Sequence, residues 1–401
     1  MKLTYRNLFI AVFSAAFATP SQAQSLNRTL ESTSAGSSGS SSYACSNSSP
    51  CDSVVFNSMN FQDFNQLLNN TQAGSDNRRT VCLMGGADIV QSAIDDFAIT
   101  VPNNNFCIKG EAGLGSRIEG TQANLQGFSD PLVDVDQKGS FAMLNLALTS
   151  PNHRQIFKIS KSTDLSLEFV SMSRLRQDDS FDYAMIVHRT PTKKMNVVQI
   201  VSPGGGGLKF TNSDNGLMEA KQVSELTIYS ERVSMYLTDY DIHNLKHSNF
   251  VSEDRQGIVL DQHDIGSKIW NAGDIDVFVK EDYAIDLHSS GEIGLAENVR
   301  LHLLTNSPEA AILMRPNSRI NKIEQMEIHT NSASLSGPYG IQFETFSSQL
   351  GSIGDIFGLT YFGGSFAQQV GEICPLLFDT NGMNVDLFVQ GSIEDIGCVL
   401  K

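Results

Sequence analysis

The sequence predicts an all-β protein built as a parallel β-helix, a solenoid of stacked coils, with one short capping helix near its N-terminus. Three observations predict this fold. Short runs that alternate apolar and polar residues fill most of the chain after residue 79. A pattern recurs at spacings of 27, 27 and 29 residues in the second half. Helical periodicity is convincing in one segment only, and a repeat of this length with short strands and little helix is typical of a solenoid.

Residues 1–23 are predicted to be a secretory signal peptide. Lys2 and Arg6 form a basic start, an apolar run covers 8–18, and Ser21-Gln22-Ala23 is a small-x-small cleavage site. The mature protein is therefore expected to be secreted, at the cell surface or periplasmic. Since no later stretch approaches 18 apolar residues, we expect no membrane insertion.

Composition limits the partners. The chain of 401 residues has 28 Lys and Arg against 44 Asp and Glu, a net charge of −16. Without Lys2 and Arg6 the mature charge becomes −18, from 26 basic and 44 acidic residues. Nucleic acid is a poor partner for such a chain because phosphate binding needs a basic surface. With 40% hydrophobic residues, the chain can still form a large core.

A leader is predicted to precede the folded domain. Residues 24–54 are rich in Ser, Gly, Thr and Asn, which favours a flexible segment, and the β-helix domain is predicted over 55–401. Within the domain, 60–69 should form the capping helix. Asn60 is a good N-cap, and the predicted apolar face consists of Phe61, Phe64, Leu67 and Leu68.

The repeat aligns four strands and four connecting strands. The first set is Gly257-Ile-Val-Leu-Asp261, Ala284-Ile-Asp-Leu-His288, Ala311-Ile-Leu-Met-Arg315 and Gly340-Ile-Gln-Phe-Glu344. The second set begins at Ile275, Val299, Met326 and Phe357. Each unit therefore carries at least two short strands, and alternate side chains should fill the interior of the coil.

The entry to this repeat resembles the pectate-lyase-like right-handed parallel β-helix superfamily. The likeness rests on Val81-Cys-Leu-Met-Gly-Gly86, on residues 99–110 and on Ser116-Arg-Ile-Glu-Gly120. It covers roughly 55–401 and concerns architecture, including a helix that caps the first coil. The resemblance implies a right-handed coil, and it implies no single activity because the superfamily contains enzymes, adhesins and passenger proteins.

Two function classes follow. The first, which we favour, is a non-catalytic extracellular or cell-surface protein for binding or adhesion, with a polysaccharide or cell-surface glycan as its partner. The alternative is a polysaccharide hydrolase or lyase that uses a groove along one β-sheet. No cofactor is expected, apart from a possible calcium ion.

The aligned strands place four ionisable residues in one outward column: Asp261, His288, Arg315 and Glu344. Stacked coils lie ~4.8 Å apart, so these side chains should form a ladder of opposite charges. An acid, an imidazole and a guanidinium within reach of one another can perform acid and base chemistry on a sugar chain. A solvated ladder of charge pairs is the other interpretation.

Two further acidic motifs are candidates. Asp178 and Asp179 follow Gln177, an arrangement similar to the paired aspartates of polygalacturonase-type hydrolases, although the other motifs of those enzymes are absent. Asp239 and Asp241 alternate on a predicted strand, which would put both carboxylates on one face as oxygen ligands for calcium.

The six cysteines of an exported chain are expected to form disulfides. Six cysteines allow 15 pairings, and spacing gives the preferred one. Residues one coil apart stack within disulfide range. The predicted bonds are Cys45–Cys51, which closes a short polar loop, and Cys82–Cys107 and Cys374–Cys398, whose members are 25 and 24 residues apart.

Overall fold

The structure is a computed structural model, and it describes part of the chain. The described residues are 45–74, 77–92, 97–102, 104–113, 115–120, 131–136, 139–176, 182–212, 218–305, 310–330, 339–344, 348–358, 362–363 and 389–390.

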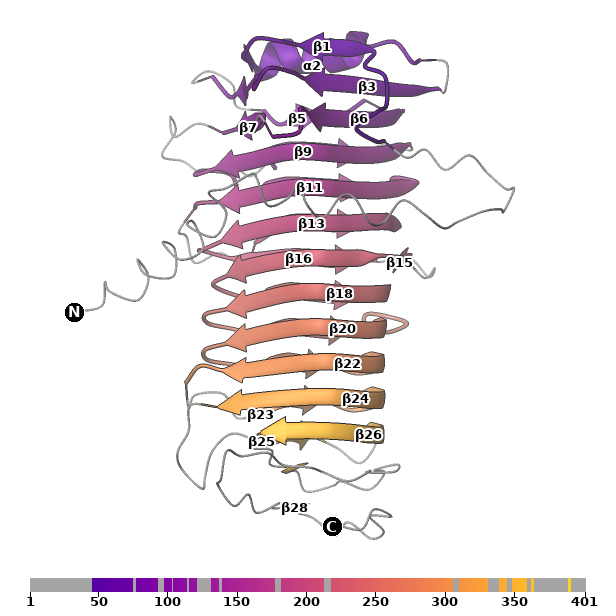
Figure 1. The fold of residues 1–401 in the computed structure, drawn as a ribbon, viewed down its shortest axis with the longest axis vertical. Coiled ribbons are helices and arrows are strands. Elements are labelled where there is room, and N and C mark those ends of the chain that lie inside the picture. Colours follow the sequence, from indigo (N-terminus) through magenta and orange to yellow (C-terminus); the bar gives the residue numbers. More distant parts are fainter. Residues whose placement is uncertain are drawn as a thin grey trace, which may run out of the picture. The chain divides into compact units, whose positions relative to one another are not determined.

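The described residues form a parallel β-helix, as the repeat predicts. The chain passes alternately through two parallel sheets, so that strands of one sheet stack along the axis of the coil (Figure 1). Sheet A has 16 strands: β1 (Ser53–Val55), β2 (Met59–Asn60), β3 (Arg78–Leu83), β4 (Ile89–Val90), β6 (Asn105–Gly110), β7 (Arg117–Glu119), β9 (Ser140–Ser150), β11 (Asp164–Arg174), β13 (Thr192–Ser202), β15 (Met218–Ala220), β16 (Val223–Ser230), β18 (Tyr240–Ser252), β20 (Lys268–Val279), β22 (Glu292–Leu303), β24 (Arg319–Thr330) and β26 (Gln349–Gly358).

Among the described residues, sheet B has 12 strands and forms the opposite wall of the coil. They are β5 (Ile99–Thr100), β8 (Val133–Asp136), β10 (Phe157–Ser160), β12 (Tyr183–His188), β14 (Gly206–Thr211), β17 (Met235–Thr238), β19 (Ile258–Asp261), β21 (Ile285–Leu287), β23 (Ala310–Met314), β25 (Tyr339–Phe343), β27 (Phe362–Gly363) and β28 (Val389–Gln390).

The core is the interior of the coils, and its register confirms the aligned repeat. Ile258 pairs with Ile285, Ile285 with Ile312, and Ile312 with Ile341. All four side chains are buried, because alternate residues of each strand point inward. The aligned residues therefore stack directly above one another, and so do the outward residues that lie between them.

The long strands of sheet A bend once per coil at a residue in the left-handed conformation. At this residue φ lies between 47° and 54°, and the residue occupies the same place in seven coils. We call them the bend residues: Asn145, Phe169, Val197, Glu225, His247, Asp274 and Asn298. Asn and Asp tolerate this conformation best among residues other than glycine. Stacked Asn298 and Asp274 also share a hydrogen bond of 3.0 Å between Nδ2 and Oδ1.

Replacing Asn298 by Val is expected to lower the free energy of unfolding by about 2 kcal/mol. A β-branched side chain in the left-handed conformation costs about 1–2 kcal/mol, and the bond to Asp274 is lost. Urea unfolding would measure the change. Asn298→Gly is the matched control, since glycine keeps the conformation and loses only the hydrogen bond. A valine variant as stable as the glycine variant would contradict this account of the bend.

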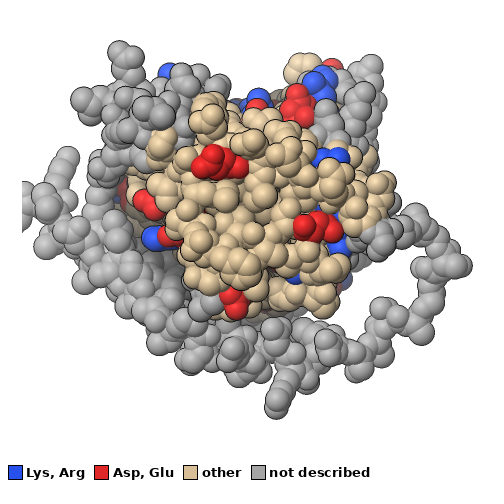
Figure 2. All heavy atoms as spheres, turned by 90° about the horizontal axis from the view of Figure 1, so that it is seen from above, with Lys and Arg blue, Asp and Glu red and all other residues tan. Residues whose placement is uncertain are grey.

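The N-terminal end of the coil is closed by a helix, as predicted. Helix α2 spans Phe61–Asn70, and the Asn60 side chain caps it by accepting the Asp63 N–H at 2.8 Å. Phe61, Phe64 and Leu68 are buried against the first coils. Figure 2 shows few charged side chains on the described surface at this end. In the part of the chain that is described, no helix is long and apolar enough to cross a membrane.

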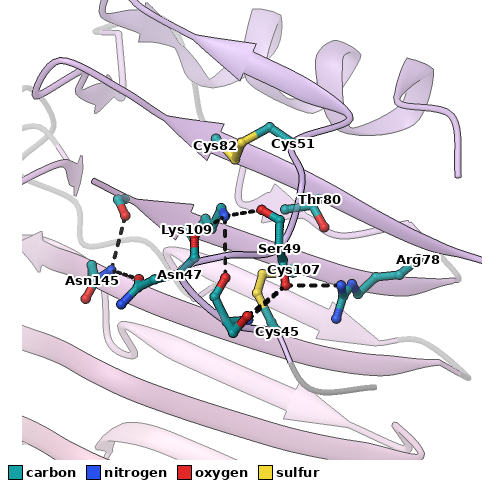
Figure 3. Close-up of a disulfide and its surroundings, with 12 residues drawn as sticks. Cys45, Asn47, Ser49, Cys51, Arg78, Thr80, Cys82, Cys107, Lys109 and Asn145 are labelled. Carbon is teal, nitrogen blue, oxygen red and sulfur yellow. Dashed lines mark hydrogen bonds between the residues drawn. A yellow bond between two sulfur atoms is a disulfide. The ribbon is translucent and has the colours of Figure 1, made fainter. Parts of the chain in front are cut away.

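The cysteine pairing differs from the predicted one. The structure has Cys45–Cys107 and Cys51–Cys82, with Cα atoms 6.1 and 5.7 Å apart, in place of Cys45–Cys51 and Cys82–Cys107 (Figure 3). The reason lies in the register. Cys82 stacks on Lys109, and Cys107 stacks on Thr80, so the two cysteines miss each other by two positions. The predicted Cys374–Cys398 bond lies outside the described residues.

The leader was predicted over 24–54, but its last ten residues, 45–54, pack on the β-helix. Residues 45–52, which we call the strap, cross the outside of β3, β6 and β9, and β1 then pairs with β3. The strap covers outward side chains that would otherwise be exposed, including Ala142 and Leu144. Residues 45–54 therefore belong to the domain.

Candidate functional site

The four candidate residues of sheet B lie on one column, as the aligned repeat predicts. Asp261 follows the last inward residue of β19, and His288 and Arg315 follow the equivalent residues of β21 and β23. Glu344 follows Phe343, which pairs with Met314 of β23. We call Asp261, His288, Arg315 and Glu344 the sheet B column. His188 ends β12 in the same row of sheet B.

Beside the sheet B column lies Asp286 of β21, which the sequence did not predict as a site residue and which binds two members of the column. Its side chain has no exposed surface. Its carboxylate accepts two hydrogen bonds from Arg315, at 2.9 Å from Nε and 3.1 Å from Nη2, and one from His288 Nε2 at 3.1 Å. Gln256 Nε2 lies 3.4 Å from the same carboxylate. Arg315 and His288 are thus held in place by a buried anion between them.

Contacts continue along the column on both sides of His288 and Arg315. His288 Nδ1 lies 3.4 Å from Asp261 Oδ1, and Asp261 also accepts a hydrogen bond from the Tyr236 hydroxyl. At the other end, Arg315 Nη1 lies 3.3 Å from Glu344 Oε1. Each ionisable group of the column therefore contacts a partner of opposite charge or a hydroxyl.

These contacts set the protonation states. Burial raises the pKa of Asp286, but hydrogen bonds from His288 and Arg315 outweigh it and hold the pKa below its usual value. The hydrogen bond to Asp286 raises the pKa of His288 above its usual value, against the opposing effect of burial. His288 is therefore favoured as the imidazolium, the form in which both ring nitrogens donate.

Two tyrosines and a lysine extend the site along sheet B. Lys209 Nζ lies 5.6 Å from the ring centre of Tyr183 and 5.2 Å from that of Tyr236. The two ring centres are 6.1 Å apart. Burial lowers the pKa of Lys209, and nearby Asp261 opposes this effect. The face thus presents a cation and two aromatic rings next to the sheet B column.

The geometry gives no support to a calcium ion shared by Asp239 and Asp241. Asp239 is in the left-handed conformation, with φ of 50°, so the strand alternation assumed for the pair is broken there. Its buried carboxylate accepts four backbone N–H groups, from residues 263–266, at 2.8–3.0 Å. Asp241 accepts the indole N–H of Trp270 at 3.1 Å. Each carboxylate therefore has protein donors of its own.

The remaining candidates are a pair of aspartates, a three-residue cluster and a small cavity. Asp178 and Asp179 lie outside the described residues. Asp239, His263 and Asp264 bring three possible ligand atoms within 4.8 Å of one another, but His263 and Asp264 are exposed and Asp239 already holds the loop. A small cavity inside the coils is lined by apolar side chains such as Ile258, Ile285 and Met326, and it offers no polar group to a ligand.

Comparison with known proteins does not assign this chain to a family. No family model, no curated protein and no solved structure matches this chain. The described geometry alone therefore supports a function, and its main feature is a row of paired ionisable side chains along the outer face of sheet B.

Proposed function

We propose that the protein is an exported, non-catalytic binding or adhesion protein whose sheet B face contacts an extended glycan. The observation that carries the proposal is the form of the site. Its ionisable groups follow one another from rung to rung of a sheet, ~4.8 Å apart, and each already has a partner. A long ligand that lies along the axis can contact successive rungs in the same way.

The chemistry of the column suits a ligand rich in hydroxyl groups. A hydroxyl both donates and accepts, so it can bond to the carboxylates of Asp261 and Glu344 and also to the N–H groups of His288 and Arg315. The rings of Tyr183 and Tyr236 add amphipathic surface beside them. With a mature net charge of −18, a polyanion would be repelled at long range, which favours a neutral glycan.

Export is consistent with the rest of the molecule. The predicted signal peptide leads out of the cytoplasm, and the described domain contains two disulfides, which persist in oxidising compartments. Architecture supports a place within the pectate-lyase-like β-helix superfamily, where binding proteins and enzymes share one fold.

The test is binding of the mature protein to a glycan array, followed by titration of the glycans that bind. His288→Gln is expected to weaken binding about tenfold, because glutamine keeps one donor and loses the charge. His329→Gln, on sheet A, is the matched control and should bind as the wild type does.

Wild-type binding should also decline as the pH rises through the raised pKa of His288, and His288→Gln should remove that dependence. Equal affinity of wild type and His288→Gln would reject the column as the contact surface.

A second candidate function, a polysaccharide-active enzyme, is favoured by the protonated state of His288. An imidazolium held between two carboxylates beside Arg315 can act as a general acid. The same glycans, incubated with the wild type and assayed for new reducing ends, distinguish the two functions. Turnover that His288→Gln removes would support the enzyme, and binding without turnover supports the binding protein.

A further inference from the structure

A second surface, on sheet A, has a different chemistry from the sheet B column. It lies after the bend on five successive strands, β9, β11, β13, β16 and β18 (Figure 1). Two outward positions per strand stack in register, and all ten residues are uncharged. We call them the uncharged strip: Ala147, Thr149, Ser171, Ser173, Gln199, Val201, Thr227, Tyr229, Asn249 and Val251.

Charged residues bound the strip at both ends. Arg117 and Glu119 of β7 pair with its first rung, and Asp276 of β20 pairs with Asn249 of its last. Asp276 forms an ion pair with Arg300 on the next strand. The ten stacked residues, of which nine are partly exposed and Val251 is buried, therefore form a distinct uncharged surface with defined limits in a chain with 44 acidic and 28 basic residues.

Six polar side chains of the strip are available to a ligand, and the seventh, Tyr229, donates its hydroxyl to Glu253. Within the described part of the chain, no hydrogen bond is made by the side chains of Thr149, Ser171, Ser173, Gln199, Thr227 or Asn249. The sheet B column differs in this respect, because its groups are bonded to one another. Hydroxyl and amide side chains donate and accept at once, so the strip offers both functions on each of its five rungs.

The bend residues beside the strip are unusual for their backbone conformation. Phe169 and Val197 both have φ of 54°, a value that disfavours bulky and β-branched residues. Equivalent positions in other coils hold Asn145 and Asn298. Phe169 is also 38% exposed, so burial alone does not account for a phenyl ring there. Strain kept at a surface position is an indication of function.

We propose that the uncharged strip, with the Phe169 ring at its edge, is a second binding surface, and that it docks onto a neutral, insoluble polysaccharide. Charge selects this partner. A polyanion is repelled by the acidic protein, and a polycation finds no carboxylate on the strip. Neutral sugar rings match it, since their hydroxyls pair with the free polar side chains and their apolar faces can lie against Phe169. A strip of five rungs is also short for a stable interface with a second copy.

The first test is sedimentation of the mature protein with cellulose or chitin particles. Thr227→Lys and Thr227→Glu each place a charge on the fourth of the five rungs of the strip, and both are expected to weaken binding about tenfold, because a charge buried against a neutral surface loses its hydration. Opposite effects of the two charges would show a charged ligand and overturn the proposal. So would a wild type that does not sediment with either polymer.

The second test removes the aromatic ring at the edge of the strip. Phe169→Asn puts a residue suited to the left-handed conformation at the bend, so the variant should fold and still bind particles about tenfold more weakly. Ile265→Asn, which changes another exposed apolar residue, away from the strip, should bind normally. His329→Gln, which lies on β24 outside both surfaces, should also sediment as the wild type does. If the Thr227 variants instead dissociated a wild-type dimer in analytical ultracentrifugation, the strip would be a self-association surface and the proposal would fail.

Discussion

Replacing Arg315 by Leu is expected to lower the free energy of unfolding by about 3 kcal/mol. Arg315 makes two of the hydrogen bonds that the fully buried Asp286 carboxylate accepts. Without Arg315, the carboxylate keeps His288 and Gln256, and its desolvation is no longer offset. Breaking a buried ion pair on one side costs about 3–5 kcal/mol, and His288 reduces this figure.

The double variant Arg315→Leu, Asp286→Leu gives the control. It removes the buried charge together with its partner, so most of the lost stability should return. Denaturant unfolding of the wild type, the two single variants and the double variant would complete a thermodynamic cycle. A double variant whose loss equals the sum of the two single losses would show that Arg315 and Asp286 are not coupled.

Acid provides an independent check of the same pair. In the wild type, the pKa of Asp286 is held below its usual value, so its stabilising contribution is present above the unfolded pKa of about 3.9 and is lost as the pH falls through the folded pKa. In Arg315→Leu, burial acts with less opposition and raises the pKa of Asp286. The stability difference between the two proteins should therefore be largest at neutral pH and shrink on acidification.

Asp286 is a residue of the site that the repeat alone does not predict. The aligned strands placed Asp261, His288, Arg315 and Glu344 correctly because small and apolar residues recur on both sides of them. Asp286 lies two positions earlier, in a row whose other aligned members are Val259, Leu313 and Gln342. A single acidic residue in a row that is otherwise uncharged does not form a pattern from which a site could be predicted. The available signal was the pair Asp286-x-His288, which on a strand points to one face.

One difference between the predicted and the observed strand alignment is an error of register. The sequence aligned Phe357 with Met326, whereas the structure pairs Met326 with Ile356. A slip of one residue exchanges the two faces of a strand. The bend residues could not be predicted from the repeat either. Asn, Phe, Val, Glu, His and Asp occupy the position in different coils, so its shared left-handed backbone leaves no common residue type.

The disulfides of the strap are expected to produce the other large effect on stability. Replacing Cys51 and Cys82 by Ala should destabilise the first coils by about 3–4 kcal/mol, and replacing Cys45 and Cys107 by about 4 kcal/mol, from the closed loops of 31 and 62 residues. Coils of a solenoid contact mainly their neighbours, so the loss should concentrate at the N-terminal end. Hydrogen exchange resolved by peptide would locate it in α2, β3 and β6 and leave β20 and β22 unchanged.

The strap also covers a buried cation, Lys109. The hydrogen bonds of this lysine can be tested separately from the disulfides of the strap. Lys109 is 6% exposed, and its ammonium donates to the carbonyls of Ser46, Asn47 and Ser49 at 3.4, 3.1 and 2.5 Å (Figure 3). Burial, together with Arg78, lowers the pKa of Lys109. Lys109→Met should therefore loosen the strap by less than either cysteine change, since the covalent bonds remain.

Peptide mapping without reduction decides whether the strap is closed as described. The expected fragments join Cys45 to Cys107 and Cys51 to Cys82. Recovery of Cys45–Cys51 and Cys82–Cys107 would contradict the register, because Cys82 faces Lys109 and Cys107 faces Thr80 on the neighbouring strands. Bonding those two cysteines would require β3 to slide by two residues along β6. Such a slip keeps the inward residues inward, so only the strap and its disulfides distinguish the two registers.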